Sequence, residues 1–166
     1  MRVVDLETLY EYNYWARDRI LEAAQNVSPH NLSRELDISY SSILGSMTHI
    51  LNAESLWRIR CQDRVSPKRV KFEAPVDSLP QLKTHWAEEQ LSMTAYLSEL
   101  TDDALDVSVT YERISGGVKT DLLWEILTHV VNHGTQHRSE VALALTNLGY
   151  SPGDLDFIVF LRARPR

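Results

Sequence analysis

Histidines at four-residue intervals are the most distinctive chemical feature of the sequence. His129, His133 and His137 lie within one long segment of helical apolar spacing. In an α-helix four residues turn by about 40° and rise by about 6 Å, so neighbours in this series share one face. Two imidazoles placed in this way can bind one divalent metal ion. His129 and His137 are about 12 Å apart along the axis, too far for all three to share a tetrahedral ion.

The apolar pattern of the same segment selects one pair of these histidines. His133 and His137 fall inside the apolar stripe of the predicted helix, whereas His129 falls at its edge. Burying two imidazoles without a partner is costly, so this placement favours metal binding over two ordinary core histidines. We expect His129 to support the site or to have a structural role. The stripe is formed by Leu122, Ile126, Val130, Val141, Ala144 and Leu148.

A third ligand must come from another helix, and His49 is the best candidate. It lies in the middle of a predicted helix, on the flank of an apolar stripe that includes Ala53 and Trp57. A single buried histidine is more often a hydrogen-bonded core residue, and this alternative stays open for His49. Two histidines from one helix and one from another leave coordination positions free for water or substrate, as in catalytic metal sites. His30 and His85 are expected to be ordinary surface residues.

Two carboxylates are candidate catalytic groups. Glu140 lies near the angular position of His133 and could orient His137 or accept a proton. A solvated charge at a pocket rim is an equally open interpretation of Glu140. Glu54 is a weaker candidate for the same role. Arg138 points elsewhere on the predicted helix, so we expect it in a salt bridge or at a dimer surface.

The single cysteine and two glycines complete the set of unusual positions. Cys61 cannot form an internal disulfide, and we expect a small, partly buried apolar residue rather than a nucleophile. Gly134 directly follows His133 and costs about 1 kcal/mol of helix propensity relative to Ala. Close approach of another backbone would explain it. Gly45, one turn before His49, has the same interpretation, with a tolerated surface glycine as the open alternative.

Helical apolar spacing predicts four long helices that must position these residues. Residues 107–120 alternate instead, with β-branched side chains around Gly116 and Gly117, and predict a short hairpin. All six prolines lie outside the helix interiors. The predicted fold is therefore all-α, a four-helix bundle with a short β-hairpin insertion before helix four and a short C-terminal helix. The predicted helices cover residues 5–26, 41–62, 78–100, 121–148 and 155–164, and residues 63–77 form a loop.

Length, charge and hydropathy narrow the classes of function. A chain of 166 residues fits a single domain over residues 1–166. Seventeen Lys and Arg against 23 Asp and Glu give a net charge of −6, so the field of the protein repels phosphate backbones and nucleic acid is not an expected partner. No apolar run approaches the roughly 20 residues of a membrane span, and the N-terminus lacks a signal-peptide core. We expect a cytoplasmic protein with no membrane partner that acts on a small-molecule substrate.

Three segments of the chain resemble the DinB family of helical-bundle metalloproteins. The opening helix of that family is similar to YNYWARDRIL at residues 12–21, and its second helix to SILGSMTHILNAESLWRIR at residues 42–60. Its closing half is similar to WEILTHVVNHGTQHRSEVALALTNLGYSPGDLDFIVFLR at residues 124–162. The most specific element is the run Asn132-His133-x-x-x-His137-Arg138 combined with His49 upstream. One departure is that Ser139 and Glu140 replace the Gly-Gln that often follows in the family, which adds a negative charge beside the site.

The resemblance implies a fold, a metal site and a chemistry. It implies a bundle of up-up-down-down order, frequent homodimers, and His49, His133 and His137 as ligands of one zinc, nickel or other divalent ion, with iron and manganese as alternatives. Related proteins of the wider superfamily look like thiol-dependent enzymes. The resemblance thus implies transfer of a low-molecular-weight thiol to an electrophile in detoxification or stress response.

Two other functions stay open at this point. One is metal-dependent hydrolysis, in which Glu140 or Glu54 would act as general base. The other is a non-catalytic, dimeric metal-binding stress protein in which the ion only stabilises the fold.

Overall fold

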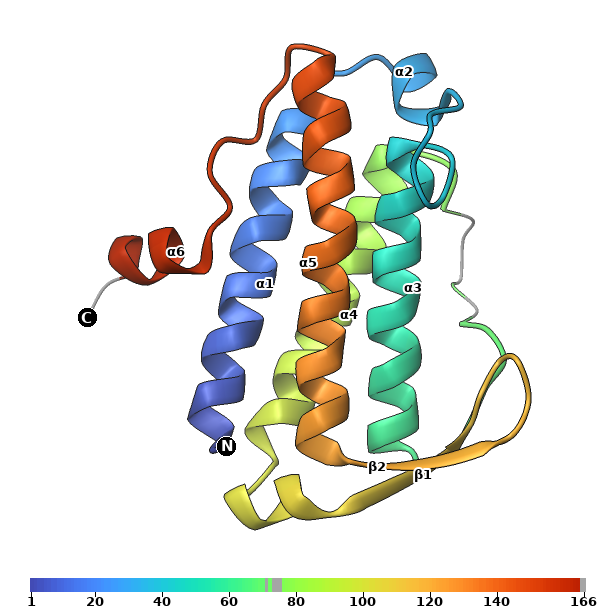
Figure 1. Ribbon diagram of the computed structural model, residues 1–166, viewed down its shortest axis with the longest axis vertical. Helices are drawn as coiled ribbons and strands as arrows, with labels where there is room; N and C mark the ends of the chain where they lie inside the picture. The colour runs from blue at the N-terminus through green and yellow to red at the C-terminus, as the bar shows by residue number, and fades with distance from the viewer. Residues whose placement is uncertain (71, 73–75, 165–166) are drawn as a thin grey trace.

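Four long helices lie side by side in this computed structural model, which describes residues 1–70, 72 and 76–164 (Figure 1). The predicted long helices, the hairpin before the last of them and the short C-terminal helix are confirmed. None of the described helices is both long and apolar enough to cross a lipid bilayer. The helices are α1 (Val3–Ala24), α2 (Pro29–Ser33), α3 (Ile43–Gln62), α4 (Leu79–Ser98), the 3-10 helix η1 (Asp102–Asp106), α5 (Leu123–Asn147) and α6 (Phe157–Ala163); the strands are β1 (Ser108–Glu112) and β2 (Val118–Leu122).

The hairpin and α2 follow from local sequence signals. Strands β1 and β2 pair antiparallel, and both turn glycines, Gly116 and Gly117, have positive φ angles of 90° and 84°. Helix α2 lies between the predicted helices over residues 5–26 and 41–62, where no helix was predicted from the sequence. Ser28 accepts a hydrogen bond from the Asn31 amide at 3.3 Å, and Pro29 occupies the first turn, where its missing N–H costs nothing. A capped single turn is too short to show apolar periodicity.

The direction of the long helices differs from the prediction. The chain runs up through α1, down through α3, down again through α4 and up through α5 (Figure 1). The parallel course of α3 and α4 is evident from their contacts, because Arg58 binds Glu89 one turn beyond the contact between Glu54 and Trp86. The predicted up-up-down-down order is wrong. The chain between α3 and α4 is long enough to return to the end where α3 began, whereas the link through α2 reverses direction at one end.

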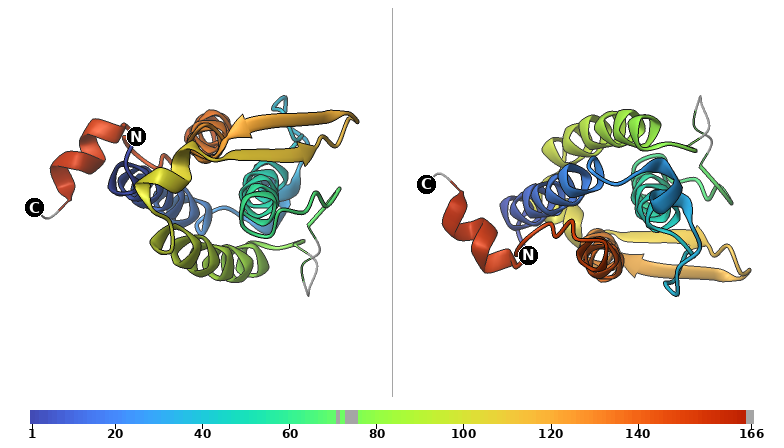
Figure 2. Two further views of the ribbon diagram at one scale, coloured as in Figure 1. Left: turned by 90° about the horizontal axis from the view of Figure 1, so that it is seen from below. Right: turned by 90° about the horizontal axis from the view of Figure 1, so that it is seen from above.

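Two apolar clusters fill the interior, one toward each end of the long helices. On α5 the first cluster extends to Val131 and the second begins at Val141. Viewed end-on, α6 lies outside α1, and the hairpin projects past α3 on the opposite side (Figure 2). Between the two clusters lies a set of buried polar side chains, here called the polar layer: Asn13, Arg17, Glu54, Glu89 and Arg138. The histidines lie beside this layer.

Candidate metal centre

Three histidines converge between α3 and α5. Antiparallel packing of these helices brings His49 opposite His133 and His137, whose spacing places them on one face of α5. The Nε2 atoms of His49 and His133 lie 3.1 Å apart. One ring nitrogen of each of the three histidines lies within 4.8 Å of the other two. His49 and His133 are half-buried, and His137 is buried. The structure thus brings together the three residues that the sequence selected.

The chemistry of this donor set fits a divalent ion. A tetrahedral ion with bonds of 2.0–2.1 Å holds its ligand nitrogens about 3.3 Å apart, close to the 3.1 Å between His49 and His133. Burial, followed by the electrostatic interaction with nearby His137, lowers the pKa of His49 to about 4. The same two causes lower the pKa of His133 to about 4. Both rings are therefore neutral at pH 7, with lone pairs available to a metal without loss of a proton.

Glu140 holds the third ring in place. Its Oε2 lies 3.2 Å from Nδ1 of His137, so Nε2 of that ring remains for a metal. Ser39 donates a hydrogen bond of 2.6 Å to the other carboxylate oxygen, and this bond lowers the pKa of Glu140. Of the interpretations left open for Glu140, the geometry favours orientation of His137. Ser39 comes from the segment before α3, and nothing in the sequence marks it as a partner.

A tyrosine covers His49. The ring of Tyr40 stacks on the His49 ring, with centroids 3.6 Å apart and an angle of 15° between the planes. This position depends on Gly45, where a Cβ atom would lie 2.5 Å from the Tyr40 carbonyl oxygen. The expected close backbone approach at Gly45 is confirmed. Ser42 caps α3 by accepting a 2.9 Å hydrogen bond from the Gly45 amide. Sequence reasoning missed Tyr40, because ring stacking across a loop has no periodic signal.

Comparison with known protein families shows which family the chain belongs to. The sequence profile of the DinB family matches residues 1–166, the whole chain. The chain belongs to the DinB family. A relative named Protein DinB, from Bacillus subtilis (strain 168), is 23% identical over 159 residues, which cover 92% of this chain and 91% of the relative. The predicted resemblance to the DinB family is therefore confirmed, and the histidine cluster of this DinB-family protein is compatible with metal binding.

The second carboxylate candidate lies in the polar layer of this DinB-family protein. Glu54 is 1% exposed and accepts hydrogen bonds from Tyr14 at 2.7 Å, Asn13 at 3.2 Å and Trp86 at 3.5 Å. These donors come from α1 and α4, on the other side of α3 from the histidines. Burial raises the pKa of Glu54 above its ordinary range. The contacts favour a structural role in which Glu54 joins three helices.

Arg138 is buried and forms no ion pair with any residue that the structure describes, so its predicted place in a salt bridge or at a dimer surface is wrong. It is 2% exposed and donates hydrogen bonds to the side chains of Asn13 and Thr135. Burial lowers its pKa to about 10. A Cβ atom on Gly134 would lie 2.7 Å from Nη1 of Arg138 and 3.1 Å from Oδ1 of Asn13. Gly134 therefore makes room for side chains, and not for the backbone that we expected.

The remaining histidines and the cysteine lie outside the cluster. His30 and His129 are exposed. The expectation of a surface position is wrong for His85, which is 7% exposed and stacks on Phe72 with ring centroids 4.8 Å apart. Cys61 is buried, and burial raises the pKa of its thiol to about 12. At neutral pH this thiol is protonated and a poor nucleophile.

A cavity of about 630 Å³ adjoins the histidines of this DinB-family protein. His49 and His133 form one border, and Trp57, Tyr111 and Arg113 line other parts of it. It is large enough for a small-molecule ligand next to the ring nitrogens.

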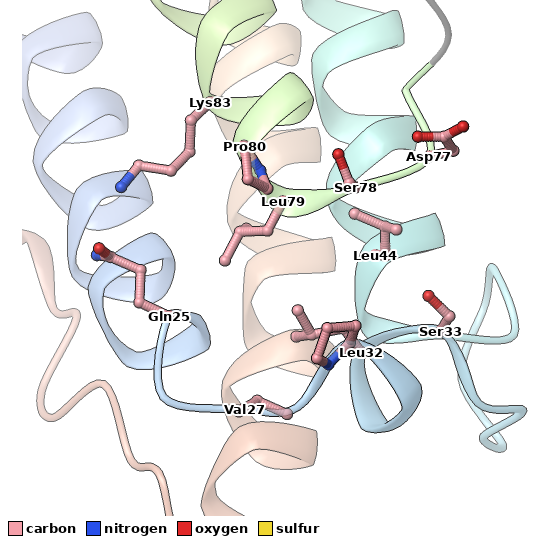
Figure 3. A pocket seen from close by; sticks show the side chains of 11 residues that line it. Gln25, Val27, Leu32, Ser33, Leu44, Asp77, Ser78, Leu79, Pro80 and Lys83 are labelled. Atoms are coloured by element: carbon pink, nitrogen blue, oxygen red, sulfur yellow. The ribbon is translucent and has the colours of Figure 1, made fainter.

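A separate cavity of about 480 Å³ lies at one end of the helices, between α2 and the start of α4 (Figure 3). Leu32, Leu44 and Leu79 line it, together with Asp77 and Lys83. It has no histidine, and the candidate site is therefore the cavity beside the cluster.

Proposed function

We propose that this DinB-family protein is a metal-dependent enzyme that joins a low-molecular-weight thiol to an electrophile in detoxification or stress response. His49, His133 and His137 would hold one divalent ion, with zinc or nickel favoured over iron or manganese, because a given set of ligands generally binds Mn²⁺ and Fe²⁺ more weakly. The observation that carries the proposal is that nitrogens of three histidines, from two helices, lie within 4.8 Å of one another beside a cavity.

Each residue around the cluster has a physical task in this proposal. His49 and His133 are neutral at pH 7 because burial lowers their pKa values. Glu140 fixes the orientation of His137, and Tyr40 limits the movement of the His49 ring. A divalent ion held there would lower the pKa of a thiol or a water molecule. The cavity would hold the rest of the thiol and the electrophile, so no side-chain nucleophile is required.

Two other functions make different predictions. In a hydrolase, Glu140 would accept a proton from water, but its carboxylate already binds both Ser39 and His137. In a purely structural site the ion would be closed off from solvent. The half-buried positions of His49 and His133 beside a cavity favour an open site.

We also propose that the four long helices form a four-helix bundle as a single domain over residues 1–166. For the quaternary structure we propose a homodimer in the cytoplasm. Phe157 and Ile158 on α6 support the dimer, because 37% and 49% of these large apolar side chains is exposed.

Thiol binding can be tested on cobalt-loaded protein, whose absorption reports a sulfur ligand. Free cysteine is the probe thiol and serine the matched alcohol. We expect a charge-transfer band with cysteine in the parent and in His129→Ala, no band with serine, and no band in His133→Ala. Transfer is then measured with zinc-loaded protein, cysteine and a chromogenic aryl chloride. Formation of a water-derived product instead of a thioether, or no thiol band at all, would contradict the thiol proposal.

A further inference from the structure

The cavity beside the histidines is strongly cationic. Four of its lining residues carry positive charge, namely Arg60, Lys68, Arg69 and Arg113. No carboxylate side chain is among the described residues that line it. This concentration of cations occurs in a chain whose net charge is −6. A cleft lined by one sign of charge focuses the field and attracts ligands of the opposite sign.

Arg60 differs from the other three cations of the cavity because its side chain is buried. It is only 4% exposed, and its guanidinium carbon lies 4.8 Å from the Trp57 ring centroid and 5.3 Å from that of Tyr111. Its Nη2 donates to the Glu112 carbonyl at 3.0 Å. Its buried Nε has no hydrogen-bond partner, and within residues 1–70, 72 and 76–164 Arg60 forms no ion pair. A buried cation without an anion is costly, and a bound oxyanion would supply the missing partner.

The other three cations come from different parts of the chain and are exposed. Lys68 and Arg69 follow α3, and Arg113 lies at the end of β1. Arg113 donates from Nε to the Gly116 carbonyl at 3.2 Å, which fixes its side chain to the hairpin turn. None of them forms an ion pair with a described residue. Three segments thus present cations to a single cavity that ends at His49 and His133.

We propose that this cavity binds a small molecule bearing carboxylate or phosphate groups, with its oxyanion held by Arg60, Arg69 and Arg113. The other end of the molecule then lies at His49 and His133, the two histidines that border the cavity. Only the contact of the ligand with the histidines rests on the proposed function. For that function, the inference specifies that the substrate is an anion. Trp57 and Tyr111 line the same cavity and leave room for an apolar or flat portion of the ligand.

Calorimetric titration with three probes tests this proposal. Succinate and inorganic phosphate supply the two oxyanions, and succinamide is the neutral match for succinate. We expect saturable binding of at least one anion that weakens with added salt, and none of succinamide. The anion that binds more tightly shows whether the cavity prefers a carboxylate or a phosphate group. Equal binding of succinamide, or no binding of either anion, would overturn the proposal.

Charge-removing variants locate the binding site. Arg69→Gln and Arg113→Gln change exposed side chains, and each should weaken binding by about three- to tenfold. Arg60→Met, which keeps the stem between the two rings, should weaken it by more than about tenfold. Arg162→Gln on α6 removes the same charge on the far side of the molecule and should change affinity by less than about twofold. Equal affinities for Arg113→Gln, Arg69→Gln and the parent would overturn the assignment even if Arg60→Met fails to fold.

Anion titrations of metal-free protein distinguish this inference from the proposed function. Anion binding that persists in His133→Ala, and that still depends on Arg69 and Arg113, would support the cationic cavity even if the protein binds no metal. Binding that disappears with the metal and is unaffected by the arginine variants would overturn the cationic cavity and leave the metal site intact.

Discussion

Gly134→Ala should destabilise this protein, although replacing glycine by alanine normally stabilises a helix. Alanine normally gains about 1 kcal/mol over glycine inside a helix. Here the new Cβ would lie 2.7 Å from Nη1 of Arg138 and 3.1 Å from Oδ1 of Asn13, both buried. Displacing this pair loses a charged hydrogen bond of about 1.5–3 kcal/mol and leaves a buried donor unsatisfied for about 1–3 kcal/mol more. We expect a net loss of about 2–4 kcal/mol in the free energy of unfolding.

Urea unfolding of metal-free protein measures this loss, with linear extrapolation to water. Gln136→Ala, at an exposed position of α5, is the matched control and should change stability by less than about 0.5 kcal/mol. In an Arg138→Met background, Gly134→Ala should cost at least about 1 kcal/mol less, because the guanidinium is absent. A Gly134→Ala variant as stable as the parent would refute the reasoning, since Arg138 could then leave its site without cost.

Three further predictions concern the carboxylates and the thiol. Glu54→Ala should lower the free energy of unfolding by about 2–4 kcal/mol in a urea titration, because it leaves three buried donors without an acceptor. The control Glu88→Ala, at an exposed position, should change this free energy by less than about 0.5 kcal/mol. Glu140→Ala should weaken zinc affinity by about 10- to 100-fold in a competition titration with a chromogenic chelator, and an unchanged affinity would contradict its orienting role. Cys61 should react with a disulfide reagent at least about 100-fold more slowly in folded than in urea-unfolded protein, because its raised pKa suppresses the thiolate. The rate in folded protein should show no titration midpoint between pH 7 and 10, since the pKa is about 12, and a midpoint near the ordinary value of about 9 would contradict the burial argument.

The metal cluster could be predicted from the sequence because its geometry is local on α5. Two histidines four residues apart share a face in any helix, and an apolar stripe determines which face is buried. His49 was selected from its place on a predicted helix near an apolar stripe, with an ordinary core histidine left open as the alternative, and the family resemblance then agreed with this choice; no pattern shows which residue of α3 meets α5. Tyr40 and Ser39 lie in the loop before α3, and their contacts with His49 and Glu140 depend on tertiary structure alone.

Arg138 and His85 were misplaced for one physical reason. The apolar stripe chosen for α5 covered only part of its buried arc, because Val131 and Leu145 are buried as well and Arg138 lies between them on that face. His85 lies beside buried Leu82 and Trp86 on α4, and Phe72 from the preceding chain covers it. A polar side chain on a buried face is easily mistaken for a surface residue when its partners come from distant segments. The direction of α4 relative to α3 was also mispredicted. It depends on the path of the chain between these two helices, and no sequence pattern indicates that path.

Metal content tests the central claim most directly. The untagged parent, His129→Ala and His133→Ala proteins are loaded with zinc, dialysed and measured by elemental analysis. We predict about one equivalent of zinc in the parent and in His129→Ala, and less than about one tenth of an equivalent in His133→Ala. Equal zinc in all three proteins, or none in the parent, would contradict a metal centre formed by His49, His133 and His137.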